Sequence, residues 1–413
     1  MINYTEQIAA KLHQLKETGG YRYFLDVNKS AQHFPNFYFE DATGVKRKAI
    51  NWCSNDYLAM SVNEAVIGKL SFVAHRSGAG SGGTRNISGT TNYHRILENT
   101  LAKLHQKTAS LLFGSAYLAN LTALSTLGKI LPELVFISDE NNHASIIEGI
   151  KASGSQKLIF KHNDIIDLEK CLQSLPIDQP KIIVFESVYS MSGTIAPIVD
   201  IVLLAKKYQA LTYIDEVHAV GLYGEKGGGL TELLHIQQGV DIINGTLAKG
   251  FGVLGGYIAG DKTIIDAIRS FGAGFIFTTS LPPAICAAAN TSIELLQSNP
   301  SIGEQYHQSI QKFREVLIAH AISFHPNQTH ITIIPIGDEI ICKKISDSLL
   351  FEYGIYIQPI NYPTVKKGAA CLRITLTAKH SQADMVYLAT SLQEVLTNIS
   401  VKQSVKNYKN VLA

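Results

Sequence analysis

The chain has 413 residues, of which 46% are hydrophobic and 17% charged, and its 36 Lys and Arg against 34 Asp and Glu give a net charge of +2. This composition excludes a disordered or collagen-like chain, and the balance of charge excludes bulk attraction to nucleic acid or to an anionic membrane. At about 150 residues per domain, the length predicts two to three domains. We therefore expect a globular protein that binds any anion at a local site.

The N-terminal segment predicts an amphipathic helix and no secretory signal. Apolar residues recur there at helical spacing before a glycine pair at 19 and 20, namely Tyr4, Ile8, Leu12 and Leu15. The cysteines are 5 in number and far apart in the sequence, which argues against a disulfide framework or a structural zinc site. No apolar window approaches the ~18 residues of a membrane span. These features predict a cytoplasmic protein, and no metal site is expected.

The middle of the chain alternates short apolar runs with helical patterns. A helix is expected over 118–130, and strands are expected over 134–138, 181–185, 210–214 and 240–243. Further helices are expected between these strands, near 142–153, 164–175 and 197–209. This order predicts βαβ units and therefore an α/β fold with a mostly parallel central sheet.

The pattern changes after about residue 290. Long helices are expected over roughly 291–320, 343–353 and 381–399, mixed with strands around 330–336, 355–359 and 371–376. This mixture predicts a smaller α+β C-terminal domain. The expected limits are an N-terminal helix and extension over 1–50, a large α/β domain over 51–290, a small domain over 291–400, and a tail over 401–413.

Two glycine clusters match the pattern GxGxxG, at 78–83 and at 250–255. A dinucleotide-binding fingerprint also needs a preceding strand, a following helix and an acidic residue about 20 residues on, and neither cluster clearly has all three. A nicotinamide-dependent oxidoreductase is therefore the alternative from a different class of enzyme. The other alternative is a regulatory protein that binds a cofactor without catalysis.

The strand over 210–214 leads directly into Asp215 and His218, where functional side chains gather at the carboxyl ends of strands in α/β sheets. In isolation, the pair would more often be a helix cap and a packed histidine. Lys249 shifts this balance because it follows another strand and is flanked by Ala, Gly and Phe. A lysine in apolar surroundings loses proton affinity and can act as a Schiff-base nucleophile.

A carboxylate followed about one βα unit later by a lysine is the arrangement that pyridoxal 5′-phosphate chemistry requires. The segment from Ser115 to Tyr117 precedes a predicted helix, and its amides are candidates for holding the phosphate. A plain helix cap at Ser115 is an equally good interpretation. Thr246 is a second candidate for the phosphate.

Several motifs together resemble the α-oxoamine synthase family of fold type I pyridoxal-phosphate enzymes. The resemblance runs from about Tyr21 to His380. The motifs are Trp52-Cys-Ser-Asn55-Asp-Tyr-Leu58, Gly80-Ser-Gly-Gly-Thr84-Arg-Asn86-Ile-Ser-Gly89, Asn142-His143-Ala-Ser145, Asp215-Glu-Val-His218, Thr246-Leu-Ala-Lys249, Phe275-Ile-Phe-Thr278-Thr279 and Leu372-Arg373-Ile-Thr375. Departures from the usual family pattern occur at Ser192, Leu376 and the neighbours of Lys249.

The resemblance implies three catalytic residues. Lys249 would form the Schiff base with pyridoxal phosphate and act as the general base, Asp215 would pair with the ring nitrogen, and His143 would stack on the ring. It implies further cofactor contacts at Ser115, Ala116, Tyr117, Ser190, His218, Thr246, Thr278 and Thr279. The last two reach the neighbouring subunit's phosphate in this family, so a homodimer with shared active sites is expected.

The resemblance also implies a reaction, the decarboxylative condensation of glycine with succinyl-coenzyme A to give 5-aminolevulinate. Arg373 would bind the carboxylate of the amino acid, and Arg22 with Thr84 and Asn86 would bind the far carboxylate of the acyl group. The remaining substrate contacts would be Asn55, Ile87 and Thr364. Family members that use an acetyl, pimeloyl or longer acyl thioester are the alternatives within the family.

Overall fold

The structure is a computed structural model that describes residues 2–411, with side chains described to residue 399. Its internal contacts form two compact units. The sheet unit comprises Asn55–Ser190 and Thr194–Gln305, and the terminal unit comprises the chain up to Ser54, Met191–Gly193 and the chain from Tyr306 onwards. The domain limits expected from the sequence at residues 51, 290 and 400 remain a prediction.

The sheet unit is built on a seven-stranded sheet with the order β4-β10-β9-β8-β7-β5-β6. β10 runs antiparallel to both of its neighbours, whereas β5 to β9 pair in parallel. The strands are β4 (Ala109–Phe113), β5 (Val135–Asp139), β6 (Gln156–Phe160), β7 (Lys181–Glu186), β8 (Leu211–Asp215), β9 (Ile242–Thr246) and β10 (Gly256–Gly260). The prediction of a mostly parallel central sheet is confirmed.

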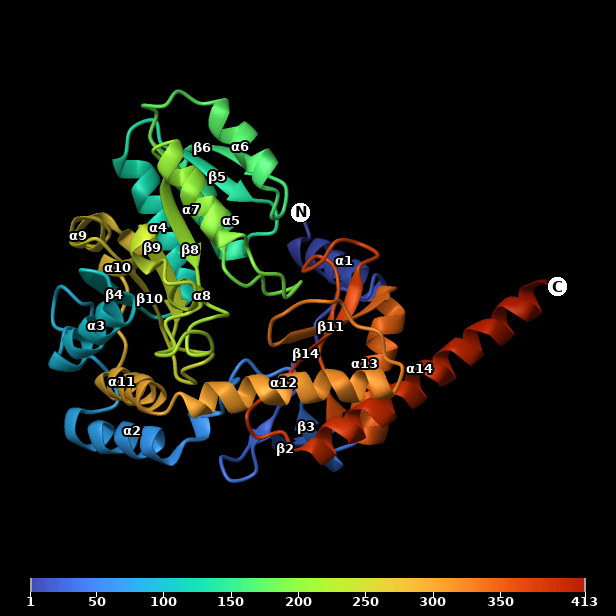
Figure 1. Cartoon of the computed structure of the whole chain (residues 1–413). Helices are drawn as coiled ribbons and strands as arrows, with labels where there is room; N and C mark the ends of the chain where they lie inside the picture. The colour runs from blue at the N-terminus through green and yellow to red at the C-terminus, as the bar shows by residue number, and fades with distance from the viewer. Residues whose placement is uncertain (1, 412–413) are drawn as a thin grey trace. The chain divides into compact units, whose positions relative to one another are not determined.

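Helices cover both faces of this sheet (Figure 1). α4 packs against α5 and α6 against α7, and right-handed crossovers place these two pairs on opposite faces. The helices are α2 (Glu64–Ser77), α3 (Asn92–Leu104), α4 (Ala116–Ile130), α5 (Ala144–Ser153), α6 (Ile165–Gln173), α7 (Ile198–Lys207), α8 (Leu230–Leu233), α9 (Lys262–Phe271), α10 (Ala273–Ile276) and α11 (Pro283–Ser298). Short 3-10 turns lie at Met60–Val62 and Gln237–Gly239.

The main core lies between the sheet and the helices around α4. Fully buried side chains of that helix, such as Ala123 and Leu127, pack with strand residues such as Phe136, Val184 and Ile258. Burying one large apolar side chain contributes about 1.5–3 kcal/mol, so this layer fixes α4 firmly against the strands. The start of α4 is thereby held beside the sheet.

The terminal unit holds two smaller sheets. One has the order β1-β2-β3-β12 and the other β11-β14-β13. The strands are β1 (Asn28–Lys29), β2 (Asn36–Glu40), β3 (Lys46–Asn51), β11 (Ile331–Gly337), β12 (Ile355–Tyr356), β13 (Pro359–Ile360) and β14 (Ala370–Thr375), and the helices are α1 (Tyr4–Glu17), α13 (Glu339–Tyr353) and α14 (Gln382–Val411). The predicted small α+β part is therefore present.

Two of the expected helices differ from the structure. The single helix expected over 291–320 is divided into α11 and α12 (Ser301–Ala319), because Pro300 cannot donate a backbone hydrogen bond within a helix. The backbone remains helical to Val411, whereas a tail was expected from residue 401. None of the helices in the described chain has the length and apolar character needed to cross a membrane.

Candidate active site

Polar side chains gather where the parallel strands of the sheet unit end. Asp139, Glu186, Asp215 and Thr246 are the last residues of β5, β7, β8 and β9. Because the carboxyl ends of parallel strands meet at one edge of a sheet, residues far apart in the sequence come together there. This edge is the candidate active site.

Lys249 ends a chain of hydrogen bonds at this edge. Its Nζ lies 2.6 Å from His218 Nε2, and His218 Nδ1 lies 2.9 Å from the hydroxyl of Tyr57. That hydroxyl donates to Asn55 Oδ1 at 3.1 Å. Since the tyrosine proton is directed to Asn55, the tyrosine oxygen accepts from His218 Nδ1, which leaves Nε2 as an acceptor for the lysine. The predicted residues Asn55, His218 and Lys249 are thus connected through a residue that the sequence analysis did not assign.

Asp215 is buried and held in one orientation. Its Oδ2 accepts a hydrogen bond from Asn120 Nδ2 at 2.7 Å, and its Oδ1 accepts the amide of Val217 at 2.9 Å. Asn120 comes from α4 and is itself fixed by the hydroxyl of Tyr213, which donates to Asn120 Oδ1 at 2.8 Å. The carboxylate therefore has a fixed position without a protein cation bonded to it in these contacts, which suits it for a cationic partner on a ligand.

His143 forms the N-cap of α5, with Nδ1 2.8 Å from the hydroxyl of Ser145 and 3.2 Å from the amide of the same residue. Desolvation is the main effect on its ring and lowers the pKa of His143, while Asp215 opposes this and Lys249 adds to it. The ring is edge-on to Tyr117, with centroids 6.1 Å apart. A neutral, oriented imidazole of this kind suits a stacking role.

Glu186 was not identified from the sequence. It is 3% exposed, and its Oε1 accepts the amide of His143 at 2.6 Å. It also receives a backbone hydrogen bond from Ser190. Desolvation is the main cause that raises the pKa of Glu186 well above its usual range, and the neighbouring charge of Asp215 adds to the effect. The buried carboxyl group of Glu186 thus fixes the backbone of His143 and of Ser190, two residues that are predicted to contact the cofactor.

We expect Glu186→Gln to gain stability relative to the natural protein as the pH rises. The folded protein raises the pKa of this carboxyl above its unfolded value, so folding is favoured while the group stays protonated and loses stability as the pH rises through the folded pKa. Glutamine keeps an acceptor for His143 and does not titrate. Thermal unfolding at a series of pH values above 4.5 measures the difference.

The control for this experiment is Glu148→Gln, which changes a carboxylate that is 50% exposed. Its unfolding temperature should follow that of the natural protein across the pH series. A constant difference between Glu186→Gln and the natural protein over the whole series would contradict the assignment of a proton to Glu186.

The predicted phosphate contacts lie at the start of α4. Ser115 is the N-cap of this helix, and its hydroxyl accepts the amide of Leu118 at 3.1 Å. The amides of Ala116 and Tyr117 belong to the first turn, which has no intrahelical partners. A side chain at Gly256 would collide with the Ala116 amide, so this glycine allows β10 to lie directly against the helix start. The structure is therefore compatible with Ser115 as a plain helix cap and with Ser115 as a phosphate contact.

Thr246 ends β9 on the same side. Its hydroxyl donates to the carbonyl of Gly255 at 3.1 Å and accepts the amide of Ala248 at 3.1 Å. It therefore shapes the turn that carries Lys249. A contact of this hydroxyl with the phosphate would come in addition to these two hydrogen bonds.

Two segments that carry predicted acyl-group contacts and predicted phosphate contacts lie together. Thr84 and Thr279 form an isolated antiparallel bridge, and the hydroxyl of Thr84 donates to Asn86 Oδ1 at 2.6 Å. Thr278 and Thr279 also line a small cavity with Gly114, beside the start of α4 in the same chain. Ile87 is 80% exposed. The acyl-binding and phosphate-binding candidates of these two segments thus form one surface.

The remaining predicted substrate contacts belong to the terminal unit. Arg22 is exposed and donates through Nη2 to the hydroxyl of Thr364 at 2.7 Å. Arg373 lies in β14 opposite Ile333 and is 7% exposed. Its burial excludes the surface position that an isolated arginine in a strand would more often have. Arg22 and Thr364 are brought together, although they are far apart in the sequence.

Three residues of the site were missed by sequence analysis, namely Tyr57, Asn120 and Glu186. Tyr57 stands inside the motif from Trp52 to Leu58, and Glu186 directly follows the strand predicted over 181–185, so their positions already pointed to the site. Asn120 stands in an apolar helix, and a polar residue on the buried face of a helix is a sign of a specific partner.

This fold and this lysine site are those of a fold type I pyridoxal-phosphate enzyme. The family model for aminotransferase class I and II matches residues 47–392. The serine palmitoyltransferase of Sphingomonas wittichii superposes with a TM-score of 0.86 at 28% identity, covering 96% of this chain and 98% of that one. A serine palmitoyltransferase from S. paucimobilis with a pyridoxal-phosphate adduct has a TM-score of 0.87 at 27% identity, covering 97% and 100%.

Curated relatives are more similar in sequence. The 5-aminolevulinate synthase of Bradyrhizobium diazoefficiens is 46% identical over 394 residues, which are 95% of this chain and 96% of that protein. The 5-aminolevulinate synthase of Rickettsia prowazekii is 46% identical over 404 residues, 98% and 96% of the two chains. The chain belongs to the class I and II aminotransferase family, within the group formed by the 5-aminolevulinate synthases.

The residues at the sheet edge fit pyridoxal phosphate. A lysine amine is available for a Schiff base, a buried carboxylate is available for a ring nitrogen, and a helix N-terminus is available for a dianion. The close approach of Gly256 to Ala116 leaves that helix start bare of side chains from β10. The sheet unit therefore offers one group for each of these three parts of the cofactor.

Proposed function

We propose that this protein catalyses the condensation of glycine with succinyl-coenzyme A to give 5-aminolevulinate, coenzyme A and CO2, the first reaction of tetrapyrrole and haem synthesis. The observation that carries the proposal is the contact between Lys249 and His218 beside the oriented carboxylate of Asp215. The family assignment supports the choice of substrates. The enzyme is thus a pyridoxal-phosphate-dependent acyltransferase.

Lys249 has two tasks in this proposal. Its amine would hold the cofactor covalently, and as a free amine it would take a proton from the glycine α-carbon. His218 Nε2 accepts a hydrogen bond from the amine, at 2.6 Å, which directs the nitrogen lone pair away from the histidine. Tyr57 holds the histidine in the tautomer that this contact needs.

Asp215 has one task, to keep a proton on the ring nitrogen of the bound cofactor. When bound, pyridoxal phosphate supplies an electron-accepting ring that stabilises negative charge at the amino-acid α-carbon. Asn120 and the Val217 amide leave the carboxylate in place while it does so. His143 covers the ring, with Glu186 fixing its main chain. Ser115 to Tyr117, Ser190 and Thr246 complete the cofactor site.

Two arginines recognise the substrate carboxylates in this proposal. Arg373 binds the carboxylate of glycine, and Arg22 binds the far carboxylate of the succinyl group together with Thr84 and Asn86. Guanidinium groups suit both roles because they bind carboxylates in a bidentate manner. The contact between Arg22 and Thr364 supports this assignment, since it holds an exposed arginine in place.

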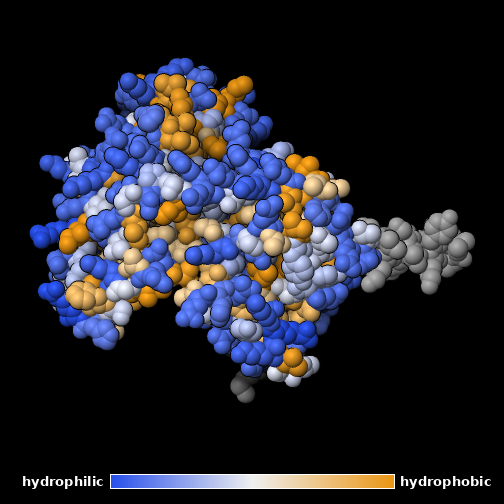
Figure 2. All heavy atoms as spheres, turned by 60° about the horizontal axis from the view of Figure 1, so that its bottom comes forward, coloured by the Kyte–Doolittle hydropathy of each residue, from blue (hydrophilic) through white to orange (hydrophobic). Residues whose placement is uncertain are grey.

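A homodimer with shared active sites is part of the proposal. The segments carrying Thr84 and Thr279 are bridged, so both would serve the same neighbouring site. They also carry exposed apolar side chains, since Ile87 is 80% and Phe277 is 81% exposed. Figure 2 shows that hydrophobic side chains reach the surface at several places among hydrophilic ones. Sedimentation of the purified enzyme measures this state.

A cytoplasmic location also belongs to the proposal. The bacterial relatives carry no organelle in their names, whereas the relative from Schizosaccharomyces pombe is described as mitochondrial. Cell fractionation followed by an activity assay would decide between these compartments.

We expect Arg22→Leu to lower the use of succinyl-coenzyme A by about 30-fold or more and to improve the relative use of uncharged acyl donors. Loss of a charged hydrogen bond to a carboxylate held in a binding site costs about 2–5 kcal/mol. The measurement is the release of coenzyme A with glycine and the succinyl, acetyl, butyryl and octanoyl thioesters. Arg95→Leu, at an exposed position in α3, is the control and should keep the natural preference.

Two outcomes would overturn the choice of acyl donor. One is a natural protein that prefers an uncharged thioester, and the other is an Arg22→Leu variant that keeps the succinyl preference. In the first case, a related synthase that uses an acetyl, pimeloyl or longer acyl group takes the place of the proposed function. In the second case, another residue recognises the succinyl carboxylate.

A further inference from the structure

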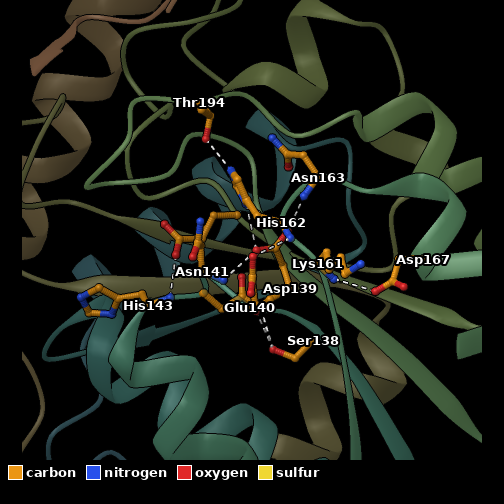
Figure 3. Close-up of polar contacts among 12 residues, drawn as sticks. Ser138, Asp139, Glu140, Asn141, His143, Lys161, His162, Asn163, Asp167 and Thr194 are labelled. Atoms are coloured by element: carbon orange, nitrogen blue, oxygen red, sulfur yellow. Dashed lines mark hydrogen bonds and ion pairs between the residues drawn. The ribbon is translucent and has the colours of Figure 1, made fainter. Parts of the chain in front are cut away.

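A second polar cluster lies at the same edge of the sheet and has no part in the chemistry above. It consists of Asp139 at the end of β5, His162 after β6 and Thr194 in the loop after β7. His162 Nδ1 is 3.0 Å from Asp139 Oδ1, and His162 Nε2 is 2.8 Å from the hydroxyl of Thr194. Figure 3 shows the imidazole between these two partners.

The protons in this cluster follow from the contacts of Asp139. Its side chain is fully buried and accepts the amides of Asn141 at 2.8 Å and Asn163 at 3.0 Å. A carboxylate that accepts from two amides also accepts from His162, so Nδ1 carries a proton. The backbone of His162 is held by a second carboxylate, since Glu140 Oε1 accepts the His162 amide at 3.2 Å.

The ring of His162 is fixed from a further side. The ring of Tyr189 stands edge-on to it, with centroids 4.3 Å apart and an angle of 85°. Tyr189 is 2% exposed, so its buried ring bounds this side of the imidazole. Nε2 is therefore a preset anchor for the Thr194 hydroxyl.

Thr194 in turn fixes the segment that carries Ser190. The amide of Tyr189 donates to the Thr194 carbonyl at 3.0 Å, and Val188 pairs with Ile195 in an isolated bridge. Ser190 directly follows Tyr189. Asp139 also holds the Asn141 amide in the turn that leads to His143. The buried carboxylate of Asp139 thus connects two segments. One carries His143, which is predicted to stack on the cofactor ring, and the other carries Ser190, which is predicted to contact that ring.

We propose that His162, with Asp139 and Thr194, is a positioning residue for the cofactor contacts made by Ser190 and His143. It acts through hydrogen bonds to their segments and does not touch the cofactor. The proposal rests on the proposed function, because the role of Ser190 belongs to it. Residues that orient the ligands of a cofactor typically affect its binding or the activity by about 10- to 100-fold.

The test compares Thr194→Val with Thr194→Ser. Valine has the same shape without a hydroxyl and should weaken pyridoxal-phosphate binding by about 5- to 20-fold, whereas serine should stay within about twofold of the natural protein. Equilibrium dialysis with pyridoxal phosphate measures the affinity. A second measurement is the pH at which the visible absorption band of the bound cofactor is half converted. This midpoint should move by roughly half a pH unit in Thr194→Val and stay unchanged in Thr194→Ser, because it reports on the contact of Ser190 with the cofactor.

The control is Thr108→Val. The hydroxyl of Thr108 accepts the Lys262 amide at 2.7 Å just before β4, away from the carboxyl ends of the parallel strands. This variant should lose unfolding stability and keep the natural affinity for pyridoxal phosphate. Equal affinity losses in Thr108→Val and Thr194→Val would overturn the proposal, as would a natural affinity in Thr194→Val.

His162→Leu provides a second measurement if Thr194→Val does not fold. It should weaken binding in the same direction, because leucine offers the Thr194 hydroxyl no hydrogen-bonding atom. Natural binding by His162→Leu would contradict the proposal. Failure of the proposed function would appear differently, as a natural protein without turnover of glycine and succinyl-coenzyme A.

Discussion

Lys249→Ala is expected to reduce turnover by about 10⁴-fold or more, while the chain folds and still binds pyridoxal phosphate without a covalent bond. One amine is assigned both the bond to the cofactor and the removal of the glycine proton, so its loss removes both. Asp215 and His143 do not depend on it, since they are held by Asn120, Glu186 and Ser145.

Borohydride reduction of the natural enzyme followed by peptide mapping checks the assignment directly. The cofactor label should appear on Lys249 and be absent from the alanine variant. Lys226→Ala, at an exposed position in the same unit, is the control and should keep both label and turnover. A label on any other lysine of the natural enzyme would show that Lys249 is not the Schiff-base residue.

Asp215→Asn is expected to lose activity by about a hundredfold or more with the fold retained. Asparagine preserves the shape, but it has one oxygen in place of two, so it keeps either the Asn120 or the Val217 hydrogen bond and not both. It carries no negative charge, so it cannot keep the ring nitrogen protonated, and the cofactor then accepts electrons less readily. Steady-state turnover together with the absorption spectrum of the cofactor measures the effect.

Asp241→Asn is the matched control for this prediction. Asp241 accepts the amide and the hydroxyl of Thr212 at 2.8 and 2.9 Å, and it precedes β9 at the opposite end of the strand from the site. Its change should lower the unfolding temperature without lowering turnover at a temperature where the protein is folded. Nearly natural turnover by Asp215→Asn would rule out the role assigned to the carboxylate.

The pattern of the sequence predicted the parallel core strands well because each contains a short apolar run. β7 is buried along its whole length and β8 from Thr212 onwards, so no alternation of exposed polar residues obscured them. β10 was not predicted. Glycines stand at both of its ends, and its place between β4 and β9 is set by antiparallel pairing with both strands. The edge strand β6 is partly exposed and was missed for lack of an apolar run.

The helix break at Pro300 was missed for a different reason, because hydrophobic periodicity does not show where a helix ends. The residues on either side continue a helical pattern of apolar positions, so periodicity favoured one helix over 291–320. A proline inside such a pattern either kinks or ends the helix, and the pattern does not distinguish the two. In the structure α11 ends at Ser298 and α12 begins at Ser301.

The sequence by itself identified Asp215, His218 and Lys249 as one chemical group, because each follows a strand in a motif of fixed spacing. The partners that orient them were decided only by the tertiary structure. Tyr57 meets His218 across 161 positions and Asn120 meets Asp215 across 95. The parallel sheet brings strand ends to one edge whatever their separation in the sequence, and only packing of α4 against that sheet determines which buried polar group reaches which carboxylate.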